Sequence, residues 1–113
     1  MQTVIRMANL DRLFHALSDP TRRAVLQDLQ RGEAAVSALA AAHSMALPSF
    51  LKHLTVLERA GLIETEKQGR TRTCRLAPGA LQPVSGWLAE QKILWESRTE
   101  RLAAFVEKQR GEP

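Results

Sequence analysis

The stretch SMALPSFLKHLTVLERAGLI, residues 44–63, decides the fold. Its first three residues leave room only for a tight turn after the preceding helix. Pro48 suits the start of a new helix, because the first backbone N–H groups of a helix have no partner within it. Apolar residues then recur at spacings of three and four until Gly61 ends the helix, and they are Phe50, Leu51, Leu54 and Leu57. A tight turn between two short helices predicts a helix-turn-helix.

Two helices are expected near the N-terminus. The first starts near Asn9 and carries apolar residues at helical spacing, namely Leu10, Leu13, Phe14 and Leu17. Asp19 can cap a second helix that begins at Pro20 and ends at Gly32. The short Ser-Asp-Pro sequence between them therefore predicts that the first helix ends there and that the second helix begins directly afterwards.

A third, alanine-rich helix leads into the tight turn. Residues 33–36 form a short connection, and Ser37 could cap a helix that runs to about His43. Leu39 is its inward-facing residue. This helix and the one that begins at Pro48 form the predicted helix-turn-helix.

Strands are expected only after the fourth helix. Residues 62–67 and 71–77 are β-prone and are joined across Gln68, Gly69 and Arg70. A long helix follows, from about Gln82 to Lys108. The order predicts a mainly α fold with a small β-hairpin: a winged helix-turn-helix with helices 1–4, a two-stranded wing and a long C-terminal helix. We expect residues 1–113 to form one domain.

The composition is that of a globular protein. The chain has 113 residues, of which 44% are hydrophobic and 25% charged. The longest apolar run, residues 38–42, is far too short to cross a bilayer, and the N-terminus lacks the layout of a signal peptide. We therefore expect a cytoplasmic protein without a membrane partner. The single cysteine, Cys74, allows no internal disulfide, and its register with Leu76 predicts a small buried residue.

The net charge of +4 is concentrated in one part of the chain. Residues 82–113 hold five basic and five acidic groups and sum to zero. Residues 67–75 hold four basic groups and no acid, and residues 34–57 contain neither Asp nor Glu. Two acid-free stretches favour a surface that faces a polyanion, and the alternative is a solvated hairpin that is merely basic.

Several short segments resemble one family. They are Asp-Pro-Thr-Arg-Arg at 19–23, Lys-His-Leu at 52–54, Ala-Gly-Leu-Ile at 60–63 and Gly-Arg at 69–70. Together they resemble the ArsR/SmtB family of bacterial transcriptional repressors, over roughly residues 8–106. The resemblance implies a dimeric repressor that binds double-stranded DNA through the fourth helix and the wing.

Polar residues of the fourth helix and the wing suit contacts with DNA. A helix in the major groove needs small or polar side chains, a basic residue and no carboxylate near its start. For Lys52 the alternative is a solvated lysine, and for His53 it is a half-buried packing histidine. The expected DNA-binding residues are Ser44, Ser49, Lys52, His53, Thr55, Lys67, Arg70 and Arg72.

The sequence departs from the family at the start of the fourth helix. Leu47 and Leu51 stand where many relatives carry polar, DNA-facing residues. We expect both leucines to pack against the third helix, with phosphate anchoring moved to Ser44, Ser49 and the wing.

The last helix carries a long apolar stripe that one monomer cannot cover. In the family this helix packs with the first helix against their two-fold copies, which implies a homodimer. The alternative is an intramolecular core helix. A two-fold dimer predicts an inverted-repeat operator. The expected interface residues are Leu10, Leu13, Trp87, Leu88, Leu94, Trp95 and Leu102.

Metal chemistry and catalysis are not expected. The third helix has no thiol, and the last helix has neither histidine nor cysteine. His15, His43 and His53 lie on three different helices, and no set of titratable groups has catalytic spacing. We expect no cofactor, with regulation by a small-molecule or protein effector. A metal-responsive repressor with an unrecognised site and a winged-helix protein-interaction module remain the alternatives.

Overall fold

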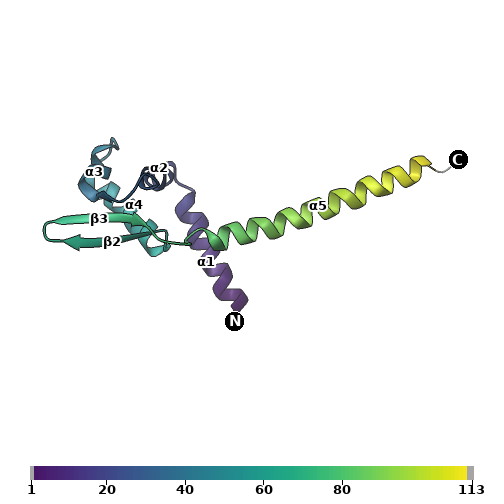
Figure 1. The fold of residues 1–113 in the computed structure, drawn as a ribbon, viewed down its shortest axis with the longest axis horizontal. Helices are drawn as coiled ribbons and strands as arrows, with labels where there is room; N and C mark the ends of the chain where they lie inside the picture. Colours follow the sequence, from purple (N-terminus) through teal and green to yellow (C-terminus); the bar gives the residue numbers. More distant parts are fainter. Residues whose placement is uncertain (1, 112–113) are drawn as a thin grey trace. The chain divides into compact units, whose positions relative to one another are not determined.

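The computed structural model describes residues 2–111 and divides the chain into two compact units, Met1–Pro83 and Val84–Pro113. Helices dominate both units, as predicted, and the winged helix-turn-helix order is confirmed (Figure 1). The elements are α1 (Gln2–Leu17), α2 (Pro20–Leu29), β1 (Ala34–Ala35), α3 (Val36–Ala41), α4 (Leu47–Arg59), β2 (Ile63–Gln68), β3 (Thr71–Leu76) and α5 (Gln82–Gly111).

The predicted start of the first helix was wrong. Helix α1 begins at Gln2 rather than near Asn9. Its first described side chains, including Val4, Ile5 and Met7, are exposed, and burial begins only at Leu10. Apolar periodicity reveals the packed part of a helix, so the exposed turns before Leu10 left no pattern to detect.

The start of the third helix also differs from the prediction. Ala35, not Ser37, occupies the N-cap of α3, and no side chain caps it. Ala35 pairs with Thr73 of β3, which holds its backbone extended until the helix begins at Val36. Leu39 is buried, as predicted.

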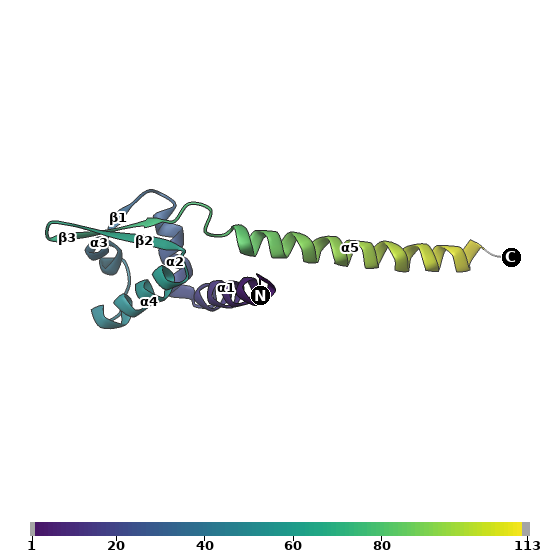
Figure 2. The ribbon, with the colours of Figure 1, turned by 90° about the horizontal axis from the view of Figure 1, so that it is seen from below.

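The predicted hairpin is confirmed, and a third strand joins it. Strands β2 and β3 pair antiparallel across the turn at Gly69, whose φ of 63° is readily adopted only by glycine. The two-residue strand β1 pairs with the other edge of β3, so the sheet order is β1-β3-β2. Helices α3 and α4 lie on one face of this sheet (Figure 2).

The core fixes α4 between the sheet and the first two helices. Phe50, Leu54 and Leu57 of α4 are buried, and the helix contacts α1, α2 and β2. The ring of Phe50 also stacks on His43, with ring centroids 5.4 Å apart, which holds the turn before α4 in place. Cys74 is fully buried, as predicted. The surface of α4 opposite Phe50, Leu54 and Leu57 therefore faces away from the core.

Candidate nucleic-acid interface

The wing presents uncompensated positive charge on the face that it turns toward the helices. In an antiparallel pair, directly opposed residues share a face, and successive residues alternate between faces. Lys67 opposes Arg72 on the same face as the buried Ile63 and Cys74. Neither cation has an ion-pair partner among residues 2–111, and like charges in this position repel.

The other face of the wing has its charge neutralised. Arg75 donates to Glu66 at 3.0 Å and to Glu64 at 3.1 Å. These hydrogen bonds, the one to Glu66 first, raise the pKa of Arg75 above its ordinary value. Of the four basic residues between positions 67 and 75, Lys67, Arg70 and Arg72 are therefore the ones available to an anion.

Helix α4 adds a polar surface that lacks carboxylates. Ser49, Lys52 and Thr55 are exposed, and so is Ser44 in the turn before the helix. The first carboxylate after this region, Glu58, accepts a hydrogen bond from Thr65 of β2 at 3.0 Å. The expected contact residues of α4, His53 excepted, thus lie at the surface, where a polyanion can reach them.

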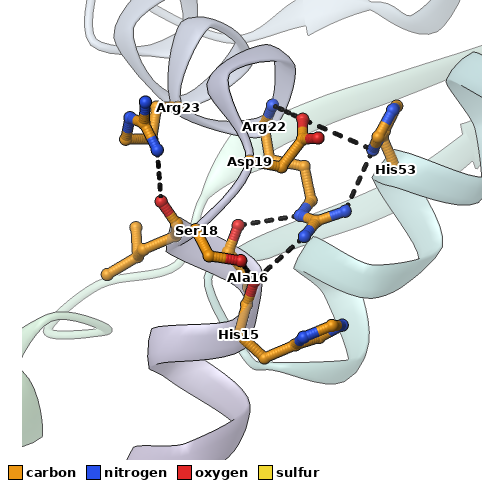
Figure 3. A network of polar contacts seen from close by, with 8 residues as sticks. His15, Ala16, Ser18, Asp19, Arg22, Arg23 and His53 are labelled. Atoms are coloured by element: carbon orange, nitrogen blue, oxygen red, sulfur yellow. Dashed lines mark hydrogen bonds and ion pairs between the residues drawn. The ribbon is translucent and has the colours of Figure 1, made fainter.

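His53 belongs to a polar network rather than to the open surface. Its side chain is 21% exposed, and Nδ1 lies 3.1 Å from Nη1 of Arg22 and 3.7 Å from Oδ2 of Asp19 (Figure 3). The same ring nitrogen thus faces both a guanidinium and a carboxylate. His53 is therefore half-buried, with its Nδ1 turned toward Arg22 and Asp19.

The Asp-Pro-Thr-Arg-Arg segment joins α1 to α2 through caps. Asp19 accepts from the backbone N–H of Arg22 at 3.0 Å and so caps α2, as predicted. That hydrogen bond lowers the pKa of Asp19. Arg22 donates to the carbonyls of Ala16 and His15, and Arg23 donates to that of Leu17 (Figure 3). Both arginines therefore satisfy the free carbonyls at the end of α1, where positive charge is favoured.

Two leucines that were expected to pack against the third helix are exposed. Leu47 is 54% exposed and Leu51 is 42% exposed. They lie one turn apart on α4 and border the buried Leu54, which with Phe50 and Leu57 fills the contact with the core. The spacing of Leu51 from Leu54 matches that of the core residues, so periodicity alone does not distinguish it from them.

A shallow groove runs between α4 and the wing. Its volume is about 270 Å³, and its lining includes Leu51 and Thr55 of α4, Thr65 of β2 and Arg72 of β3. Apolar, hydroxyl and cationic groups thus meet in this groove together with one carboxylate, that of Glu58, which accepts the hydrogen bond from Thr65.

Known proteins resemble this chain in sequence and in fold. A family model described as a helix-turn-helix domain matches residues 17–66. The transcriptional repressor SdpR of Bacillus subtilis (strain 168) is 30% identical over 79 residues, which are 70% of this chain and 88% of SdpR. A crystal structure of an ArsR family transcriptional regulator is 56% identical, with a TM-score of 0.76 over 80% of this chain and 93% of the other.

The chain belongs to the ArsR family of transcriptional regulators. A further ArsR-like neighbour is the solution structure of a homodimeric winged helix-turn-helix DNA-binding domain from Mycobacterium bovis, described as a possible ArsR-family regulator. It is 26% identical, covers 82% of this chain and 88% of its own, and has a TM-score of 0.66. The resemblance drawn from the sequence is therefore confirmed.

The residues expected at the dimer interface of this ArsR-family chain fall into three groups by exposure. Leu10 and Leu13 are buried in the core, with exposures of 6% and 4%, so neither is free to meet a second copy. Trp87 is half-buried on α5. The remaining four are exposed along α5, and they are Leu88, Leu94, Trp95 and Leu102.

The ArsR-family chain shows no cluster of metal ligands in its described part. Residues 2–111 contain no group of three or more His, Cys, Asp or Glu side chains that could hold a metal ion. Metal independence stays a prediction. No helix in the same range is both long and apolar enough to cross a membrane.

Proposed function

We propose that this ArsR-family chain is a dimeric repressor that binds an inverted-repeat DNA operator. Helix α4 enters the major groove, and the wing contacts phosphates or the adjacent minor groove. The observation that carries this proposal is the difference in charge between the two faces of the wing. Lys67 and Arg72 stand uncompensated on the face turned toward α4, while Arg75 is neutralised on the other face.

This difference in charge indicates that the cationic face of the wing contacts a polyanion rather than solvent alone. Two opposed cations destabilise a strand pair unless an anion lies between or beside them. DNA phosphates supply such anions, and the release of their counterions adds to the affinity. Arg70, exposed at the turn, extends the same cationic surface by one residue.

Helix α4 has the surface that groove entry requires. Ser49, Lys52 and Thr55 provide exposed side chains, and no Asp or Glu occurs between residues 34 and 57 to repel the phosphates. Ser44 stands in the turn, where it can reach a phosphate. His53 acts as a positioning residue through its contact with Arg22.

A dimer follows from the exposed apolar surface of α5. Leu88, Leu94, Trp95 and Leu102 are each more than half exposed, and large exposed apolar patches mark partner surfaces. The homodimeric relative from Mycobacterium bovis supports a second copy of this chain as the partner. Two-fold symmetry places two copies of α4 about 34 Å apart, which matches one turn of DNA and predicts an inverted repeat.

The experiment starts from an operator found by footprinting DNA that the protein captures from its genome. Binding is then measured as a function of salt concentration for the wild type and two variants. Arg72→Gln removes one of the uncompensated cations. The matched control, Glu64→Gln with Arg75→Gln, also removes an arginine but leaves the net charge of the opposite face unchanged.

Arg72→Gln should reduce the magnitude of the slope of log K against log salt by about 1, as expected for one lost phosphate contact. The control should keep the wild-type slope. Equal slopes for the two variants would contradict the proposed use of the charged face. Salt-independent binding, or no binding to any genomic site, would favour a protein-interaction module instead.

A further inference from the structure

Helix α4 carries an apolar stripe on the surface proposed to enter the major groove. Leu47, Leu51 and Thr55 follow one another at intervals of four residues, so they lie on one side of the helix. All three are exposed. Two exposed leucines one turn apart, continued by the methyl group of Thr55, form a contiguous apolar strip of the kind that partner surfaces carry.

Thr55 extends this stripe with its methyl group. Its hydroxyl donates to the carbonyl of Leu51 at a distance of 3.0 Å. The hydroxyl proton is therefore engaged by the backbone of the helix, and the methyl group is left for an external contact. The stripe thus presents apolar atoms. Side chains that recognise adenine or guanine instead present amide or guanidinium donors.

The surroundings of the stripe identify what can cover it. Lys52 is exposed on the same helix, and Arg72 lines the groove beside Leu51 and Thr55. Glu58 also lines this groove, but its carboxylate accepts a hydrogen bond from Thr65. An apolar strip with Lys52 on the same helix and Arg72 across the groove fits a ligand that is anionic at its edges and apolar between them. In the major groove of DNA, phosphates form the edges, and the 5-methyl group of thymine is the apolar feature on the base pairs.

We propose that Leu51, together with Leu47 and Thr55, recognises thymine by contact with its 5-methyl group. This inference rests on the proposed function, because it assumes that α4 lies in the major groove. Specificity at these operator positions then comes from methyl burial, while Lys52 and the wing supply sequence-independent affinity. In this proposal Leu47 and Leu51, which were expected to pack against the third helix, determine sequence specificity.

The test replaces thymine by deoxyuridine in the footprinted operator, one base pair at a time and symmetrically in both half-sites. This change removes only the methyl group. Burial of one methyl corresponds to about a fourfold change in affinity, so a contact in each half-site predicts a loss of about tenfold or more. Wild-type protein should show this loss at one or two positions of each half-site.

Two variants assign the effect to residues. Leu51→Ala should bind the thymine operator more weakly and should no longer distinguish it from the uracil operator at one of those positions. Arg72→Gln, the matched control, should weaken both operators alike and keep the thymine preference. Because Leu51 is exposed, the alanine variant should fold, and circular dichroism checks this.

Each alternative outcome has a separate meaning. Salt-dependent operator binding with no thymine preference at any position overturns the methyl contact but leaves the proposed function standing. A preference that persists in Leu51→Ala and in Leu47→Ala overturns the assignment to this stripe. If Leu51→Ala changes only the oligomeric state in sedimentation, the stripe contacts a second copy of the chain and the inference is wrong. Absence of any operator binding removes the proposed function itself.

Discussion

Replacement of Arg22 by methionine should destabilise the protein far more than the same replacement at Arg23. Arg22 is 8% exposed, and its Nε and Nη2 donate to the carbonyls of Ala16 and His15 at 2.8 and 2.9 Å. The residue four positions after Ala16 is Pro20, which has no N–H to offer that carbonyl. Arg22 is therefore the donor that replaces the missing helical hydrogen bond.

The expected size of the effect follows from these contacts. Methionine keeps the apolar stem of the side chain, so the main loss is the hydrogen bonding. The carbonyl of His15 retains the N–H and hydroxyl of Ser18, but that of Ala16 keeps no other donor among the described residues. Burial of an unsatisfied acceptor costs about 1–3 kcal/mol, and a midpoint of about 2 kcal/mol lowers Tm by roughly 8–16 °C.

The control is Arg23→Met, which removes one exposed hydrogen bond to the carbonyl of Leu17. It should change the free energy of unfolding by no more than about 0.5 kcal/mol. Urea and thermal unfolding at one fixed protein concentration measure both variants, because the Tm of a dimer depends on concentration. The reasoning is refuted if Arg22→Met is as stable as the wild type, or if both variants lose the same stability.

Four further outcomes are expected. Since the pKa of Asp19 is lowered by the hydrogen bond from the backbone N–H of Arg22, its contribution to stability is present above its ordinary pKa and lost as the pH falls through the lowered value. Asp19→Asn should therefore flatten the fall of the urea midpoint below about pH 5, and an unchanged profile would contradict this. Burial raises the pKa of the Cys74 thiol, so iodoacetamide at pH 8 should alkylate it slowly until urea unfolds the chain; equal rates in both states would count against burial. Sedimentation should find a dimer at micromolar concentration and a monomer for Trp95→Glu, whose native side chain is 68% exposed, and a monomeric wild type would remove the basis for an inverted repeat. Zinc, cadmium, copper and arsenite should leave operator affinity within a few-fold, whereas a tenfold loss abolished by Cys74→Ser or His15→Ala would establish a metal sensor.

The sequence alone determined the features that depend on neighbouring residues. The cap at Asp19, the proline near the start of α4 and the turn at Gly69 are each specified by a few adjacent residues. The burial of Leu54 and Leu57 follows from a periodicity within one helix. Helix order, hairpin position and family resemblance could be predicted because all of them rest on such local patterns.

Only the tertiary structure decided which of the predicted surface groups are left without an ion pair or a buried position among the described residues. Strand register pairs Arg75 with two glutamates and leaves Lys67 opposite Arg72, a distinction that a count of basic residues cannot make. The contact between Arg22 and His53 joins residues 31 positions apart. Leu51 is exposed although its spacing matches that of the core, because the side of α4 that meets other elements is chosen by packing. These outcomes depend on contacts between distant segments, whose geometry is set when the whole core assembles.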